Sequence, residues 1–269
     1  MIARLDHLRK HPAVFRHLTG IPVAVFDELA AGVVPAVESA HRARLDRPGR
    51  RRAVGGGDDF DLSTADQVLL TVVWLRQYPT NEALGFLFGV SDSTASRARA
   101  RCLPALEKAG KDTMRLPDPG RGRRKRLPAL LQDTPGLAVV VDSFEQRTQR
   151  PKRRQRAYYS GKKRAHTLKS QVGVDEESGR VVDVSDSVPG PWADIKLLRR
   201  SRLLTRLPEG VRYNRAFNRR RVVVECAIGR LRRFRAVAHV NRHRREGHAA
   251  RVRAIAGLVN RMLGHRAAS

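Results

Sequence analysis

The run Leu137-Ala138-Val139-Val140-Val141-Asp142 decides the fold of the C-terminal half of this chain. Five consecutive apolar residues, three of them β-branched, are typical of a strand that is buried on both faces. The strand is expected to end in the carboxylate of Asp142, followed by Ser143. A carboxylate at the end of a buried strand is well placed for chemistry, although an aspartate there is also common as a loop cap.

Alternating strands and helices are predicted on the C-terminal side of this run. Residues 166–175 and 180–188 read as two strands joined by a turn at Glu177-Ser178-Gly179. Helices are predicted over residues 192–204, 214–235 and 248–263, where apolar residues recur at helical spacing. Residues 136–266 are therefore expected to form an α/β core.

The N-terminal half reads as helical, in two parts. Residues 1–46 carry apolar residues at helical spacing, and a basic, glycine-rich linker is predicted over residues 47–60. Residues 61–112 read as three short helices, and a second linker rich in proline, glycine and arginine covers residues 113–135.

Capping residues divide the segment 61–112 into its three helices. Ser63 and Asp66 form a capping box before the first helix, and Tyr78-Pro79 ends it. Gly89 closes the second helix, and Ser91 caps the third. Pro104 is expected to kink or break that third helix.

The charge of the chain points to a polyanionic partner. Among 269 residues, 54 Lys and Arg face 26 Asp and Glu, which gives a net charge of +28. Such a surface attracts nucleic acid and binds its phosphates by releasing counterions. Cys102 and Cys226 form neither a metal-binding spacing nor a disulfide framework, and no stretch has the length of a membrane span. We therefore expect a cytoplasmic, nucleoid-associated protein without a membrane partner.

The segment 81–102 predicts how double-stranded DNA is recognised. A short helix, a tight turn at Gly89-Val90-Ser91 and a second helix that begins with small polar and arginine residues are typical of a helix-turn-helix. An ordinary helical hairpin is the alternative. The side chains expected to face DNA are Ser93, Thr94, Ser96 and Arg97. Those expected to hold the two helices together are Leu84, Leu87, Val90 and Ala98.

Two further stretches carry excess positive charge. Residues 144–165 hold nine Lys or Arg and one acid, Glu145, which suits either phosphate contacts or a solvated loop. Residues 212–269 hold sixteen Arg and two acids, Glu225 and Glu246. On the predicted helix around it, Glu225 lies at the edge of an apolar face with arginines on either side. An ion pair with these arginines is the alternative to a role in chemistry.

The order of motifs resembles that of a known family. The motifs are Asp142 after the strand, Ser160-Gly161-Lys162-Lys163, Pro189-Gly190 ahead of Asp194, and Arg221 with Glu225 and Arg232. In this order, after a helix-turn-helix, they resemble bacterial insertion-sequence DDE transposases, in the branch shared with eukaryotic Harbinger-type elements. The resemblance runs from the start of the helix-turn-helix to near the C-terminus.

The resemblance implies a ribonuclease H-like core that holds two divalent ions with three carboxylates. Two such ions stabilise the entering and leaving oxygens in phosphodiester displacement, and oxygen ligands suit Mg²⁺, with Mn²⁺ as a substitute. Asp142 corresponds to the first carboxylate and Glu225 to the third. The residues expected to contact DNA are Lys162, Lys163, Arg221 and Arg232. Binding to terminal repeats and target DNA, and assembly as a homo-oligomer, are also implied.

The second carboxylate is missing from its expected place. Relatives carry it on a strand after the helix of residues 192–204, whereas here no Asp lies between Arg206 and Glu225. We therefore expect a core that lacks a central strand and exposes the edge of the first one. The acids that could substitute are Asp194, Asp186 and Glu209.

Three functions follow from these expectations. The first is a metal-dependent transposase whose cleavage is impaired in this copy. The second is a protein that only binds element ends and represses transposition. The third, a general RNA-binding factor, lacks the aromatic sheet motifs that it would need.

Overall fold

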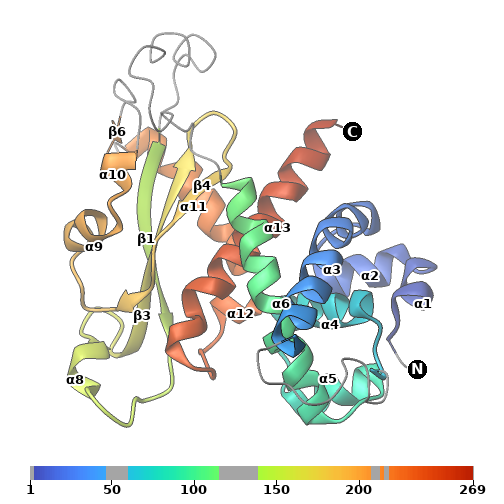
Figure 1. The fold of residues 1–269 in the computed structure, drawn as a ribbon. Coiled ribbons are helices and arrows are strands. Elements are labelled where there is room, and N and C mark those ends of the chain that lie inside the picture. Colours follow the sequence, from blue (N-terminus) through green and yellow to red (C-terminus); the bar gives the residue numbers. More distant parts are fainter. Residues whose placement is uncertain (1–2, 47–59, 115–138, 207–212, 215–217, 269) are drawn as a thin grey trace.

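The computed structural model describes residues 3–46, 60–114, 139–206, 213–214 and 218–268 (Figure 1). Most of the predicted linkers, the start of the apolar run at Leu137 and Ala138, and Glu209 lie outside the described residues. In Figure 1 the sheet lies on one side, the N-terminal helices lie on the other, and two long helices, α6 and α13, lie between them.

The N-terminal residues are helical, as predicted. Helices α1 (Leu5–Arg9), α2 (Pro12–Thr19) and α3 (Val23–Leu45) bury apolar side chains such as Phe15 and Phe26, whose rings meet edge to face at 5.4 Å. No single helix in the described parts of the chain is long and apolar enough to cross a membrane. Helices α2 and α3 pass that test only as a pair bent by 61°.

The three predicted helices of the helix-turn-helix are confirmed as α4 (Thr64–Gln77), α5 (Asn81–Phe88) and α6 (Asp92–Thr113). Ser63 Oγ accepts a hydrogen bond from the Asp66 N–H at 3.1 Å, and Ser91 Oγ accepts one from the Thr94 N–H at 3.0 Å. Gly89 ends α5 with a φ of 63°, a left-handed conformation that glycine adopts without a steric penalty.

The predicted break at Pro104 is wrong, because α6 continues to Thr113. The proline is exposed, whereas Leu106 and Gly110 beyond it are buried. A proline removes one hydrogen bond from a helix interior, and packing of the following turns against α13 (His248–Ala268) offsets that loss.

The sheet is built on one long antiparallel pair. Strand β1 (Val139–Arg147) pairs with β3 (Ala165–Asp175) from Val139↔Asp175 to Arg147↔Thr167. Three short strands, β2 (Tyr159–Ser160), β4 (Val181–Val184) and β5 (Val188–Pro189), pair with β3. The order β2-β3-β1-β6 completes the sheet. The mixed helix-and-sheet class is thus confirmed.

Asp142 does not end β1, contrary to the sequence-based expectation. The strand continues through it to Arg147, so residues 144–147 belong to the sheet and not to the basic loop, of which α8 (Gln155–Tyr158) forms a part. The reason is that polar side chains beyond the apolar run find buried partners. Gln146, for example, donates to the carbonyl oxygen of Ala236 at 3.0 Å.

Two of the three helices predicted after the sheet are divided, whereas the third, α13, extends to Ala268, beyond its predicted end at residue 263. The helix of residues 192–204 is divided into α9 (Asp194–Ser201) and α10 (Leu203–Arg206) at Arg202, whose φ is 52°. The helix of residues 214–235 is α11 (Asn218–Arg232), followed by α12 (Arg235–Ala238).

A short strand lies beside β1 where a missing central strand was predicted. Strand β6 (Tyr213–Asn214) pairs in parallel with β1 at Val139 and Val140 only. A strand is thus present where none was expected, but it covers just two residues of β1. Beyond Val140, no strand in the described part of the chain pairs with this edge of β1.

Helices α6 and α13 cross at two glycines. A Cβ added to Gly257 would lie 2.3 Å from the Gly110 Cα, and one added to Gly110 would lie 2.3 Å from the Arg253 carbonyl oxygen. Real side chains do not approach backbone this closely, so the crossing requires glycine on both helices. One hydrophobic cluster therefore runs from the N-terminal helices into the sheet.

A buried histidine attaches α13 to the sheet. His248 Nε2 donates to Gln146 Oε1 at 2.5 Å, and Ser187 Oγ donates to His248 Nδ1 at 2.6 Å. Burial, together with the charge of Arg251, lowers the pKa of His248 from 6.5 to about 3. The ring is therefore neutral in the folded protein.

Substitution at the glycine crossing should destabilise the protein. Gly257→Ala should lower the free energy of unfolding by roughly 1–3 kcal/mol, because the methyl group meets backbone that cannot move aside. Gly264→Ala is the control on the same helix, since nothing lies within 4 Å of its Cβ; it should raise stability by about 0.5–1 kcal/mol. Urea unfolding measures the free energy of unfolding of both variants. An equal change in the two would contradict the close contact of α6 and α13 at these glycines.

Acid should destabilise the protein through His248. Between about pH 3 and pH 6.5 the unfolded chain binds a proton that the folded chain excludes, so stability is complete above this window and falls as pH drops through it. In His248→Gln the slope of unfolding free energy against pH should decrease by up to about 1.4 kcal/mol per pH unit. The exposed His17→Gln is the control. Identical slopes in wild type and His248→Gln would contradict a buried neutral imidazole.

Candidate functional site

A cleft of about 650 Å³ opens at the edge of β1 that β6 leaves uncovered. Its walls come from β1, from the turn after β2, and from the segment that leads into α9, with one side chain from α11. Among the residues that line it are Asp142, Ser143, Glu145, Lys162, Lys163, Lys169, Trp192, Asp194 and Arg232. The cleft thus gathers five charged residues that the sequence singled out, namely Asp142, Lys162, Lys163, Asp194 and Arg232.

Asp142 is half-buried in the wall of this cleft. Its Oδ1 accepts a hydrogen bond from the backbone N–H of Ser143 at 2.7 Å. This local bond orients the carboxylate without neutralising it.

Asp194, at the start of α9, is held by two side chains from the sheet. Ser143 Oγ donates to its Oδ1 at 2.7 Å, and Lys169 Nζ donates to the same oxygen at 3.0 Å. Partial burial alone would raise the pKa of Asp194, but the hydrogen bonds from Ser143 and Lys169 and the charges of Lys169 and Lys162 outweigh burial and lower it. Asp194 is therefore an ionised carboxylate that already has a cation.

Lys169 is almost fully buried among oxygen atoms. Besides Asp194, its ammonium donates to the Trp192 carbonyl oxygen at 2.6 Å and lies 3.8 Å from Glu145 Oε1. Glu145 in turn accepts from Thr167 Oγ1 at 2.8 Å. The ammonium thus supplies a fixed positive charge on this side of the cleft.

Side chains alternate between the two faces of the sheet along β1, and this places Asp142 and Asp194 on opposite sides of it. Ser143 and Glu145 point toward α9 and Asp194, whereas Phe144 lies under Arg232 of α11 at 5.9 Å and Gln146 bonds to His248 of α13. Successive strand residues face opposite sides of a sheet. Asp142 therefore shares the α11 side with Phe144, and Asp194 lies on the α9 side.

Glu225 lies on α11 outside the cleft lining. Its side chain is exposed, and it precedes Arg232, which does line the cleft, by seven residues. Seven residues are nearly two helical turns, so the two side chains share a face and lie roughly 10 Å apart along the axis. The structure places Asp142 and Glu225 on packed neighbours, β1 and α11, but does not bring both into one pocket. The side chain of Arg221 lies outside the described residues.

The described residues do not form a complete metal site. No three His, Cys, Asp or Glu side chains are grouped so as to hold an ion in the parts of the chain that the structure describes. The cleft offers Asp142 on one side of the sheet and a lysine-bound Asp194 on the other. This donor set does not fit two ions held by three carboxylates, and Asp186, the other described substitute, pairs with Arg253 elsewhere.

Only two of the four helix-turn-helix residues predicted to contact DNA are exposed. Ser93 and Arg97 are exposed on α6, whereas Thr94 and Ser96 are half-buried. Thr94 Oγ1 accepts from Ser91 Oγ at 2.9 Å, and Ser96 Oγ accepts from Arg99 Nη2 at 3.5 Å. Ser93 and Arg97 are thus the predicted DNA-contacting residues that are exposed.

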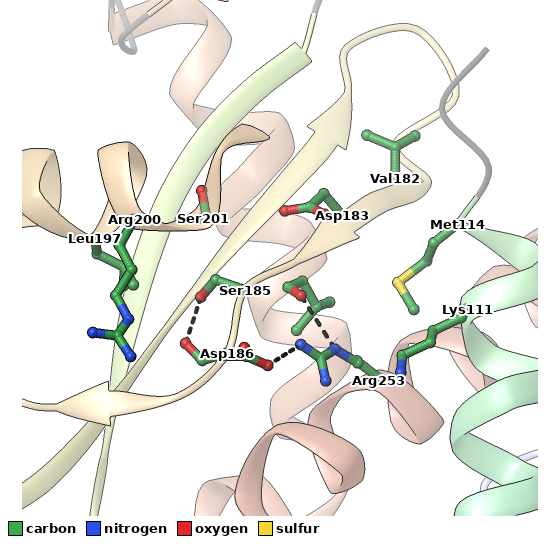
Figure 2. Close-up of a pocket in the computed structure, with 11 residues that line it drawn as sticks. Lys111, Met114, Val182, Asp183, Ser185, Asp186, Leu197, Arg200, Ser201 and Arg253 are labelled. Atoms are coloured by element: carbon green, nitrogen blue, oxygen red, sulfur yellow. Dashed lines mark hydrogen bonds and ion pairs between the residues drawn. The ribbon is translucent and has the colours of Figure 1, made fainter. Parts of the chain in front are cut away.

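A second cavity, of about 600 Å³, lies between α6, β4, α9 and α13 (Figure 2). Figure 2 shows Arg253 extending toward Asp186, with which it forms an ion pair. Arg253 also donates to Glu107 Oε1 at 3.0 Å, and Lys111 lies 2.9 Å from the same oxygen. The two cations and the two carboxylates pair with one another. The residues that line this cavity therefore connect the helices to the core.

Sequence reasoning missed Ser143 and Lys169, which hold Asp194, and Glu145, which lies beside Lys169. Ser143, Glu145 and Lys169 were not singled out as a group, although Ser143 and Glu145 share one face of any strand that includes both. That signal was lost because the strand was expected to end at Asp142.

Comparisons with known proteins match two segments of the chain. The family model described as helix-turn-helix of DDE superfamily endonuclease matches residues 60–112, and the model described as DDE superfamily endonuclease matches residues 141–210. The second match includes Asp142 and Asp194 and ends before Glu225. Members of this superfamily use divalent metal ions.

One relative resembles the chain over nearly its whole length. It is described as a probable transposase for insertion sequence element IS702 from Microchaete diplosiphon. The two sequences are 27% identical in an alignment of 281 residues, which covers 91% of this chain and 93% of the relative. No solved structure matches the chain at a significant level. The two family models and this relative agree: the chain carries the helix-turn-helix and endonuclease segments of the DDE superfamily and is similar to transposases of insertion sequences.

Proposed function

We propose that this transposase binds the terminal repeats of its element through α5 and α6, and that its ability to cut DNA is impaired. The proposal rests on where the carboxylates lie in and around the cleft. Of the carboxylates expected to hold metal, Asp142 is available, Asp194 is bound to Lys169, and Glu225 lies outside the lining.

End recognition is supported by the helix-turn-helix and by charge. The capped start of α6 exposes Ser93 and Arg97, as a helix that enters a major groove requires. The net charge of +28 supplies the attraction to phosphates on which any DNA affinity depends. Target DNA would use the same charge, and Lys162, Lys163 and Arg232 around the cleft are suited to contact it.

Impaired cleavage follows from the geometry of the acids. We assign Asp142 and Glu225 as the remaining ligands, with Mg²⁺ as the ion and Mn²⁺ as its substitute, because oxygen donors suit both. A segment that carries the second aspartate is missing between Arg206 and Tyr213. Asp194 is a poor replacement, since it would have to give up Lys169 and reach around the edge of β1. Metal sites tolerate little such displacement.

A second candidate function is repression by a protein that only binds. The complete set of caps in α4, α5 and α6 favours it, because the DNA-reading unit keeps its local structure although the cleft is incomplete. Such a chain would occupy element ends, or join intact subunits as a homo-oligomer, in the bacterial cytoplasm on the nucleoid.

A combined binding and nicking experiment tests the proposal. Purified protein is mixed with supercoiled DNA that carries the element ends, with Mg²⁺ or Mn²⁺, beside Asp142→Ala. We expect a salt-sensitive shift of end DNA on a gel and no metal-dependent nicking above that of Asp142→Ala. In Arg97→Ala the preference for end DNA over unrelated DNA should be lost. Nicking that Asp142→Ala abolishes would refute the impairment and identify a working site.

The pKa of Asp194 tests whether Lys169 holds it. In Lys169→Gln the pKa should rise toward the ordinary aspartate range, because one hydrogen bond and one close charge are removed. Lys162→Gln removes only a more distant charge and should raise the pKa less. Carboxyl NMR titration measures both. Equal shifts, or none, would show that the ammonium does not hold this carboxylate.

A further inference from the structure

We propose that residues 239–247, together with the basic loop of residues 148–158, bind the phosphate backbone of duplex DNA and extend the contact made by α6 toward the core. We name these two stretches the bridging surface. The inference rests on the proposed binding of element ends, and it assigns a DNA-binding surface that lies outside both the helix-turn-helix and the cleft.

Residues 239–247 are attached to the helix-turn-helix. The backbone N–H of Arg242 donates to Tyr78 Oη at 3.0 Å, and its guanidinium donates to the Pro79 carbonyl oxygen at 3.3 Å and lies over the Tyr78 ring at 4.5 Å. His243 Nε2 lies 3.3 Å from Arg99 Nη1 of α6. The segment is therefore fixed beside the turn between α4 and α5 and beside the DNA-reading helix.

The same residues are attached to the core. The Asn241 N–H donates to the Arg147 carbonyl oxygen at 2.8 Å, and the Gln149 N–H donates to the Asn241 carbonyl oxygen at 3.2 Å. Arg245 lies over the ring of Tyr158 in α8 at 4.4 Å. The bridging surface thus spans the joint between the two halves of the molecule, and Figure 1 shows α8, the start of α13 and α5 at the same end.

The charge of this surface is almost entirely positive. The two stretches contain eight Lys or Arg and one acid, Glu246. Their cations are Arg150, Lys152, Arg153, Arg154, Arg156, Arg242, Arg244 and Arg245. All of them are exposed except Arg245, which is half-buried, so the charge is accessible to a large partner.

Two buried arginines beneath the surface carry further charge. Arg251 is 3% exposed and Arg99 is 9% exposed, and the Nε of each has no hydrogen-bond partner. Within the described residues, their side chains contact Asn241, Ser96, His243 and the Trp74 ring, all of them neutral, and form no ion pair. Burial and the charges of Arg251 and Arg242 lower the pKa of Arg99 to about 10.

Buried cations without a carboxylate are costly, because desolvation is not offset by an opposite charge. A row of phosphates on the bridging surface would supply that charge from outside the protein. Duplex DNA is the partner that the surroundings favour, because Ser96, which accepts from Arg99, lies one helical turn from the exposed Ser93 at the start of α6. A duplex held at Ser93 would continue over Arg99 and onto residues 242–245.

The experiment compares two triple variants of the full chain that remove the same amount of charge. The test variant is Lys152→Gln, Arg153→Gln and Arg244→Gln, whose side chains are exposed. The control variant is Lys10→Gln, Arg16→Gln and Arg266→Gln; these residues lie just after α1, on α2 and at the end of α13. Fluorescence anisotropy measures binding to a duplex from the element end, and to an unrelated duplex of equal length, over a range of salt concentrations.

In the test variant we expect weaker binding to both duplexes by a similar factor, with an unchanged ratio between them, since phosphate contacts carry no sequence information. The slope of log affinity against log salt should fall by about 0.9 for each phosphate that the variant no longer neutralises, and the control should keep the wild-type slope. Hydroxyl-radical footprinting of wild type should show protection that extends past the helix-turn-helix site and that is absent in the test variant.

A test variant that matches the control in slope and footprint would overturn the bridging surface while leaving end recognition intact. Absence of a preference for end DNA already in wild type would instead refute the proposed function, and the slope on unrelated DNA would still decide on the surface. If the test variant unfolds, the wild-type footprint alone decides: protection confined to the helix-turn-helix site overturns the proposal.

Discussion

The pairing of β1 with β3 decides on which side of the sheet each cleft residue lies. A shift of one residue would move Asp142 to the α9 side and Ser143 to the α11 side, because strand side chains alternate. The register is held by what lies beneath α11 and α13: Phe144 is buried there, and Gln146 bonds to His248. A neutral imidazole outside the cleft lining therefore helps to position Asp142, the carboxylate proposed to hold metal. The cost of a shift is high because Gln146 and His248 would both lose buried partners.

Much of the fold could be predicted from local patterns. Caps at Ser63, Gly89 and Ser91 are short-range signals, and each forms as the sequence indicates. The predictions failed where tertiary packing overrides local preference. Pro104 is accommodated because the helical turns beyond it pack on α13. Strand β1 extends beyond its apolar residues because Gln146 has buried hydrogen-bond partners. Neither partner is adjacent in sequence, so no window around either residue could reveal it.

Only some members of the candidate site could be predicted, and its geometry could not. Asp142, Asp194, Lys162 and Arg232 meet in one cleft although they come from distant stretches of the chain. The sequence did not indicate that Lys169 would hold Asp194, or that the aspartates would face opposite sides of β1. These relations depend on register and on the start of α9. Strand β6 could not be predicted either, since two residues are too few to show a strand pattern.

The crossing of Gly110 and Gly257 gives the DNA-reading helix a second role. Helix α6 is one continuous element of 22 residues, about 33 Å long, whose start is exposed for DNA and whose far end is locked against α13. A duplex bound at the start of α6 would have a defined orientation toward the cleft. The bridging surface would bind the same duplex farther along. This orientation depends on packing in the helices and not on the carboxylates. A copy that has lost cleavage would therefore still present element ends as an active one does, and this is why it could compete with intact subunits for the same DNA.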